Sequence, residues 1–391
     1  MLRLLWHGRL ARGIMGETPM LRLLWHGRLA RGIMGETSML RFRIVDPTIP
    51  CNNHPLPIKN LMTRMFEYGN EQLDIQQWAK RVRDVANQTV EEVNRVVVGM
   101  ESVTRQFLLA LMAGGHVLLE GVPGVAKTTL SKVFARILGT EYQRVQFTPD
   151  LLPSDVTGTY IFDRKSNEFS LRKGPIFCQV LLADEVNRAP AKTQAALLEA
   201  MQENQVTIEG TTLHLPTPFM VLATQNPIEQ EGVYRLPEAQ LDRFLLRVEM
   251  GYPGRHHEIN LLKLHSGPIH EVRELFTPDL ILNIQSSLNH IFGRAELFEY
   301  IVDLAEASRS HPDVALGASP RAALCLLRCA RGRALIHGRY YFTHEDVQEV
   351  ALPVLGHRLI IRPEAEVEGK QVSDIVRDLL EKVPVLVAEG E

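Results

Sequence analysis

The chain has 391 residues, of which 45% are hydrophobic and 23% are charged, as in folded proteins with room for two domains. Its formal net charge of −3 gives no basic footprint for nucleic acid, and no apolar run approaches the about 18 residues of a membrane span. Its 4 cysteines form no CxxC pair and no disulfide-like spacing. We therefore expect a cytoplasmic protein with reduced thiols, no membrane span and no nucleic-acid partner.

The first part of the sequence is a letter-for-letter duplication, in which Met1–Thr18 recurs as Met20–Thr37. Structural repeats drift in sequence and need about three units to bury a core, so two identical copies indicate a recent duplication. We expect residues 1–38 to be disordered or outside the fold, with Met62 or Met65 as the working start. A transit peptide or a membrane-surface helix is the alternative. Residues 39–85, which contain four prolines, are predicted to be linker.

From residue 86 to residue 252, helical and strand patterns alternate, which predicts an α/β domain. The segment Leu118–Thr129 has the pattern of a strand, a glycine-containing loop and the start of a helix, as in a phosphate-binding loop. Lys127 would reach the β- and γ-phosphates, and the Thr128 hydroxyl would hold Mg²⁺. Ala126 stands where the second glycine of this motif is usual. The residues predicted to bind the nucleotide here are Gly121, Val122, Pro123, Gly124, Val125, Ala126, Lys127, Thr128 and Thr129.

Two later strands supply candidate catalytic groups. The apolar run 179–183 ends in Asp184 and Glu185, as a buried parallel strand ends at a ligand crevice. Asp184 can bind Mg²⁺, and Glu185 can orient and deprotonate an attacking water. The apolar run 219–224 is followed by Asn226, an amide that can position this water, although Asn before proline is also an ordinary turn residue. The pattern favours hydrolysis of a nucleoside triphosphate.

Two arginines follow, one at the end of a predicted helix and one at the start of another. Arg243 ends a short predicted helix over 236–244, where it either caps a surface helix or reaches a neighbouring subunit's nucleotide. Ser319 and Pro320 have the pattern of an N-cap and first helical residue before Arg321. A cation in the first turn opposes the helix dipole, so an anion nearby would explain Arg321.

The remaining pattern predicts two hairpins and a second, helical domain. The hairpins are expected at 157–172 and at 205–215. Residues 253–391 are predicted to form a helical lid with a C-terminal tail, because apolar residues recur there at helical spacing. The predicted lid helices cover 255–265, 278–291, 294–310, 320–337 and 343–355.

Taken together, the motifs resemble those of the MoxR family of AAA+ ATPases over roughly residues 90–384. The resemblance implies a P-loop AAA+ core with a parallel sheet and inserted β-hairpins, followed by a small all-α lid domain. It implies Walker A residues at Lys127 and Thr128 and Walker B residues at Asp184 and Glu185. It further implies that Asn226 is sensor 1, that Arg243 is an arginine finger acting in trans, that Arg321 is sensor 2 acting in cis, and that Gly99 lies near adenine. Arg188 and Arg235 are alternative fingers.

The resemblance also implies ATP and Mg²⁺ as cofactors, a homo-oligomeric ring, expected to be a hexamer, and hairpins that point into its pore. Clients or partners with von Willebrand factor A domains are implied, and the function would be to remodel or mature protein complexes. A nucleic-acid-stimulated motor is one alternative. An ATP-gated subunit of a chelatase-like complex, active only with its partner, is another.

Overall fold

The computed structural model describes residues 71–385, apart from 123, 166, 226–233, 235 and 266–270, and it leaves out the side chains of 71–74 and 264–265. The duplicated segment 1–38 and the linker expected up to residue 70 therefore lie outside the described residues. So do Pro123, Asn226 and Arg235, and their roles stay predictions.

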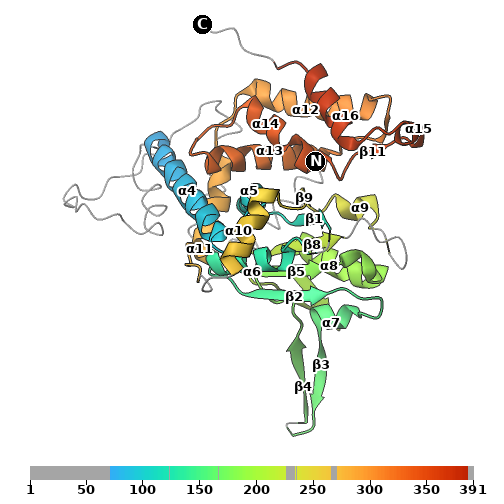
Figure 1. Cartoon of the computed structure of the whole chain (residues 1–391). Coiled ribbons are helices and arrows are strands. Elements are labelled where there is room, and N and C mark those ends of the chain that lie inside the picture. The colour runs from blue at the N-terminus through green and yellow to red at the C-terminus, as the bar shows by residue number, and fades with distance from the viewer. Residues whose placement is uncertain are drawn as a thin grey trace, which may run out of the picture. The chain divides into compact units, whose positions relative to one another are not determined.

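A five-stranded parallel sheet with the order β2-β5-β8-β1-β9 forms the centre of the α/β domain (Figure 1). Every neighbouring pair is parallel, with registers such as Leu182 opposite Leu222 and Leu119 opposite Thr224. All five residues of β5 are buried, as expected of a central strand covered on both faces. The carboxyl ends of β1, β5 and β8 consequently meet at one edge. The strands are β1 Val117–Gly121, β2 Tyr142–Gln146, β5 Val180–Asp184, β8 Met220–Gln225 and β9 Leu246–Met250.

Both predicted hairpins are present. β3 pairs with β4 and β6 pairs with β7, each antiparallel, and the β3–β4 hairpin projects from the α/β domain in Figure 1. Near its tip, Phe162 and Phe169 form an aromatic pair with ring centroids 5.2 Å apart, and Phe169 is 70% exposed. The hairpin strands are β3 Gly158–Asp163, β4 Glu168–Lys173, β6 Gln205–Ile208 and β7 Thr211–His214; the helices around the sheet are α5 Glu101–Met112, α6 Lys127–Ile137, α7 Pro153–Thr157, η1 Val186–Arg188, α8 Ala191–Glu203 and α9 Glu238–Leu241.

The boundary of the predicted linker is corrected by helix α4, Glu71–Asn94. Residues 71–85 are helical because Ile75, Trp78 and Val82 recur at helical spacing and are all buried. Trp78 donates its indole N–H to the Oγ of Ser287 at 3.0 Å. Helix α4 packs on α5, α6 and the lid helix α13, so it belongs to the folded core.

The lid is helical, as predicted, but it also contains a short antiparallel pair, β10 Val314–Leu316 with β11 Ile360–Ile361. This small ribbon corrects the expectation of an all-α lid. Helix α14 begins with a capping box, in which the N–H of Thr343 donates to Oδ2 of Asp346 at 2.9 Å. The lid helices are α10 Arg255–His265, α11 Pro278–Ser287, η2 Leu288–His290, α12 Ala295–Ser310, α13 Pro320–Ile336, α14 His344–Leu355, α15 Pro363–Val367 and α16 Val372–Lys382.

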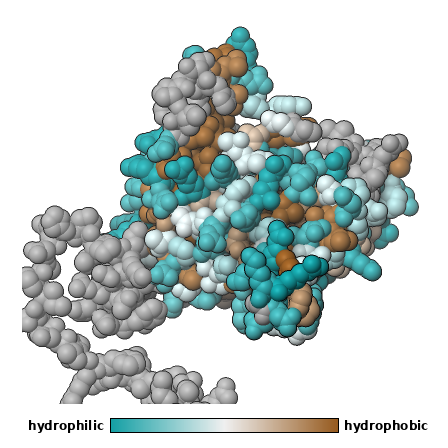
Figure 2. Space-filling model, turned by 90° about the horizontal axis from the view of Figure 1, so that it is seen from below, coloured by the Kyte–Doolittle hydropathy of each residue, from teal (hydrophilic) through white to brown (hydrophobic). Residues whose placement is uncertain are grey.

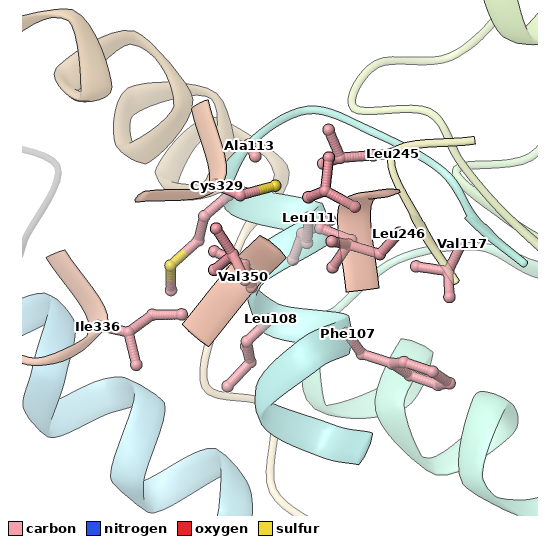
Figure 3. Packing of buried hydrophobic residues seen from close by; sticks show 14 of the residues in the cluster. Phe107, Leu108, Leu111, Ala113, Val117, Leu245, Leu246, Cys329, Ile336 and Val350 are labelled. Carbon is pink, nitrogen blue, oxygen red and sulfur yellow. The ribbon is translucent and has the colours of Figure 1, made fainter. Parts of the chain in front are cut away.

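One hydrophobic cluster continues from the sheet into the lid (Figure 3). Helix α13 packs on α5 and α4, and α14 packs on β9. Leu111 and Leu246 of the α/β domain meet Cys329 and Val350 of the lid in this cluster. The lid is therefore fixed to the sheet by buried apolar surface, the main stabilising contribution in a core.

The cysteines and the surface of the described residues agree with what the composition predicts. Cys178, Cys325 and Cys329 are buried in the core and free, in agreement with the expected reduced thiols; Cys51 lies outside the described residues. None of the helices in the described ranges is both long and apolar enough to cross a membrane. The face in Figure 2 is mostly hydrophilic, with hydrophobic patches between the polar residues.

Candidate active site

The phosphate-binding loop connects β1 to α6 at the carboxyl edge of the sheet. Gly124 and Ala126 both have left-handed backbone, with φ of 86° and 61°. This conformation explains why glycine is usual at the position of Ala126, since a side chain is strained there. At Gly121 an added Cβ would lie 2.4 Å from the carbonyl oxygen of Met250 on β9. The loop therefore needs glycine at 121 and tolerates alanine at 126.

Lys127 is the first residue of α6 and turns back over the loop. Its Nζ donates to the carbonyl oxygen of Gly121 at 2.8 Å. Burial lowers the pKa of Lys127, and the carboxylates of Asp184 and Glu185 oppose this shift. The structure thus brings together the lysine and the acidic pair that the sequence predicted on separate elements.

A threonine on β8 organises the acidic pair. The Oγ1 of Thr224 donates to Oδ1 of Asp184 at 2.6 Å and accepts the backbone N–H of Glu185 at 2.8 Å. Thr224 is fully buried, and Asp184 is 8% exposed. Glu185 has a left-handed backbone with φ of 56°, which turns the chain sharply at the end of β5. The hydroxyl of Thr224 therefore fixes both acidic residues relative to the sheet.

Sequence reasoning missed the polar side chains of β2. The Nη2 of Arg144 lies 2.7 Å from Oδ2 of Asp184, and the Nε2 of Gln146 donates to Oε2 of Glu185 at 2.8 Å. The alternation of Arg144 and Gln146 is visible in the sequence, but their role depends on β2 lying beside β5. Glu185 also pairs with Arg188 at 3.1 Å.

Two side chains at the ends of these elements carry oxygens that suit a hard cation. Asp184 supplies a carboxylate, and Thr128 follows Lys127 in the first turn of α6. Carboxylate and hydroxyl oxygens, with phosphate oxygens and water, are the ligands that Mg²⁺ prefers. The residues present therefore fit a magnesium ion bound together with a nucleotide.

A cavity of about 330 Å³ adjoins the phosphate loop. The Val97–Val98 segment and Leu261 of α10 supply apolar walls, and Gly124–Ala126 closes one side. Gly99, predicted to lie near adenine, follows this segment with φ of 79°, and an added Cβ there would lie 2.8 Å from the His257 ring. An apolar pocket beside a phosphate loop has the character of a site for a nucleotide base.

The two arginines predicted to act at a nucleotide lie away from the phosphate-binding loop of their own chain. Arg243 and Arg321 line a second cavity, of about 650 Å³, together with Arg328 and His116. His116 precedes the first residue of β1, whereas the phosphate loop follows its last residue, and five strand residues span roughly 15 Å. Among the described residues, the two cavities share none of their lining.

Arg321 lies beside the amino end of β1 and not beside the phosphate loop of its own chain, which disfavours the predicted role in cis. The cause is the packing of α13 on α5 and of α14 on β9. Arg188, an alternative finger, is paired with Glu185 of its own chain.

Comparisons with known proteins agree with this architecture. Residues 116–246 match the model of the "ATPase family associated with various cellular activities (AAA)", and residues 306–379 match the AAA lid domain. The uncharacterised protein YeaC of Bacillus subtilis is 46% identical over 76% of this chain and 94% of its own length. Chaperone MoxR1 of Mycobacterium tuberculosis is 42% identical over 75% of this chain and 80% of its own length.

A crystal structure from Cytophaga hutchinsonii, described as a candidate ATPase, superposes with a TM-score of 0.76 at 40% identity. The superposition covers 82% of this chain and 100% of the chain in the crystal structure. The parallel sheet, the phosphate loop, the lid and these relatives lead to one conclusion. The chain belongs to the MoxR family of AAA+ ATPases.

Proposed function

We propose that this protein hydrolyses ATP with Mg²⁺ and uses the cycle to remodel or mature protein complexes, as a chaperone. The observation that carries the proposal is the meeting of Lys127, Asp184 and Glu185 at the carboxyl edge of the sheet, where Thr224 binds the carboxylate of Asp184 and the backbone N–H of Glu185. The name of the relative Chaperone MoxR1 supports the remodelling role.

Each residue has a distinct role in this reaction. Lys127 leaves the carbonyl of Gly121 and binds the β- and γ-phosphates, while Asp184 and Thr128 hold the metal. When bound, Mg²⁺ neutralises charge that develops on the phosphate oxygens. Glu185 accepts a proton from the attacking water; its carboxylate is oriented by Gln146 and Arg188. Asn226 stays the proposed sensor of the γ-phosphate.

The position of Arg243 and Arg321 supports a site completed by a second subunit. Both line the cavity at the amino end of β1, so we propose that they reach the nucleotide of a neighbouring subunit in a ring, which we take to be a hexamer. An arginine finger contributes about 10³–10⁵ in rate. A subunit in isolation should therefore hydrolyse ATP slowly.

We propose that the clients or partners are proteins with von Willebrand factor A domains. The ring would meet them in the cytoplasm. The exposed aromatic pair of the β3–β4 hairpin is an apolar surface that a client can contact. The net charge of −3 disfavours a nucleic-acid substrate. Stimulation of the ATPase rate by DNA or RNA would instead favour a nucleic-acid motor.

Two variants test the proposed chemistry. Lys127→Ala should lose both ATP binding and turnover, because the β- and γ-phosphates lose their cation. Glu185→Gln should keep ATP binding and lose turnover, because an amide cannot accept the proton. Binding is measured with a fluorescent ATP analogue, turnover by phosphate release, and Glu199→Gln on the exposed face of α8 is the matched control. A Glu185→Gln protein that keeps most of its rate would show that Glu185 is not the base.

A further inference from the structure

A buried arginine of the lid holds the backbone on both sides of Arg243. The side chain of Arg358 is only 2% exposed. Its Nη2 donates to the carbonyl oxygen of Phe244 at 2.6 Å and to that of Asp242 at 3.3 Å, and its Nη1 donates to that of Leu245 at 3.2 Å. The carbonyls that flank Arg243 are thus bound by one guanidinium.

Two hydrogen bonds next to Arg358 add to these contacts. The Nε2 of His357 donates to the carbonyl of Phe244 at 3.0 Å, and Arg247 donates to the carbonyl of Gly356 at 3.1 Å. The segment 356–358, directly after α14, therefore binds the segment 242–247. Burying a guanidinium is unfavourable unless its donors are satisfied, and the planar fork of arginine supplies five of them in fixed directions.

The carboxylate of Asp242 links this segment to the second arginine. Its Oδ1 accepts from Nε of Arg358 at 2.7 Å, and its Oδ2 accepts from Oγ of Ser319 at 3.2 Å. Ser319 is the N-cap of α13 and also accepts the N–H of Ala322. Arg321 is the second residue of that helix. Asp242 consequently ties the residue beside Arg243 to the helix end that carries Arg321.

We propose that Arg358 is a positioning residue, which acts through Asp242 to hold Arg243 and Arg321 as one unit facing the neighbouring subunit's ATP. This inference rests on the proposed function. Arg358 itself does not touch nucleotide; it fixes where Arg243 points. A displacement of a catalytic group by about 1 Å can lower a rate about 100-fold. Loss of the contacts of Arg358 should therefore impair hydrolysis in the adjacent subunit and leave the variant's own nucleotide site intact.

The test compares Arg358→Lys and Asp242→Ala with Asp242→Asn in the full-length protein. Lysine keeps the charge of Arg358 but cannot bind the carboxylate and the carbonyls together. Alanine removes both side-chain contacts of Asp242, while asparagine keeps an acceptor for Arg358 and a partner for Ser319. We expect kcat to fall about 10- to 100-fold for the first two variants at nearly unchanged KM for ATP, with Asp242→Asn close to wild type.

Mixing subunits separates positioning from a general loss of structure. Each impaired variant is mixed with an equal amount of Glu185→Gln protein, which lacks the base but carries an intact Arg243. A variant subunit beside a Glu185→Gln subunit then receives a correctly placed arginine. Activity should rise from at most about a tenth of the wild-type rate for either protein alone to about a quarter of that rate per subunit in random mixed rings.

The outcomes are distinct. Full activity of Arg358→Lys and Asp242→Ala alone, or a loss that mixing does not restore, overturns the role of Arg358. If Arg358→Lys does not assemble, as judged by sizing, Asp242→Ala decides by the same criteria. The mixture of Arg243→Ala with Glu185→Gln reports on the proposed function instead. No recovery in that mixture contradicts hydrolysis by an arginine acting in trans, whatever the Arg358 variants do.

Discussion

The guanidinium of Arg144 donates to Oδ2 of Asp184 at 2.7 Å and so joins β2 to β5 at the carboxylate that we assign to Mg²⁺. Oδ1 of the same carboxylate accepts from Thr224. Both oxygens of Asp184 are therefore engaged by protein groups. A metal ion that binds Asp184 has to share or displace the contact with Arg144.

Arg144→Gln should therefore lower the Mg²⁺ concentration that gives half-maximal ATPase rate. The side chain of Arg144 is 46% exposed, and exposed ion pairs contribute up to about 1 kcal/mol, so the expected shift is about two- to fivefold. The measurement is a Mg²⁺ titration at saturating ATP. Arg188→Gln, which removes a partner of Glu185, is the control and should leave the midpoint unchanged. A higher Mg²⁺ requirement in Arg144→Gln would mean that Arg144 orients Asp184 for the metal.

Thr224→Val should lower kcat by at least about tenfold, since an amide N–H and a carboxylate oxygen of the acidic pair lose their common partner. Buried groups left without a hydrogen bond cost about 1–3 kcal/mol, which should appear in urea unfolding as well. Thr224→Ser keeps the hydroxyl and should retain most of the rate. Equal rates in the valine and serine variants would contradict the organising role of this hydroxyl.

Two substitutions test the phosphate loop in opposite directions. Ala126→Gly should leave ATP affinity within about twofold of wild type, because glycine adopts the observed φ without strain. Gly121→Ala should weaken ATP binding strongly, since the new methyl would meet the backbone of Met250. Isothermal titration with a non-hydrolysable ATP analogue measures both. Tight binding by Gly121→Ala would show that β9 moves away from the loop at small cost.

Stability should fall on acidification through His116. Burial, with the charges of Arg328 and Arg321, lowers the pKa of His116 from 6.5 to about 4. The unfolded chain then binds more protons than the folded chain between these values, so stability is full above pH 6.5 and is lost as pH falls towards 4. The loss reaches about 3 kcal/mol.

Urea unfolding between pH 7.5 and pH 5 measures this effect. His116→Gln should be less stable at neutral pH but should show a smaller decrease on acidification. Burial also lowers the pKa of His357, so that part of the dependence remains in the variant. An identical pH dependence in wild type and His116→Gln would contradict the assignment.

The elements with a strong local signal were predictable from the sequence. Asp184 ends one apolar strand, and Lys127 follows another across the phosphate-binding loop. Parallel strands bring such ends to one edge. Both hairpins and the start of α10 at Arg255 also follow local patterns. Helix α4 was missed between residues 71 and 85 because the prolines before it suggested a linker, although Trp78 and Val82 have helical spacing.

The position of the arginines was not predictable from local pattern. The side of the sheet that Arg321 faces depends on how α13 packs on α5, a long-range contact that no motif encodes. Likewise, the roles of Arg144 and Arg358 depend on strand order and on a turn of the lid meeting a loop more than a hundred residues earlier. Such residues emerge only once the elements are placed in space.

The central claim, an active site completed by an arginine of a second subunit, is tested most directly by ATPase rate per subunit against protein concentration. Sizing in the same buffer gives the assembly state. We predict that the rate rises as the protein assembles and that Arg243→Ala abolishes the rise while still binding ATP. A rate that is independent of concentration across the monomer-to-oligomer transition, or an Arg243→Ala protein as active as wild type, would contradict the account.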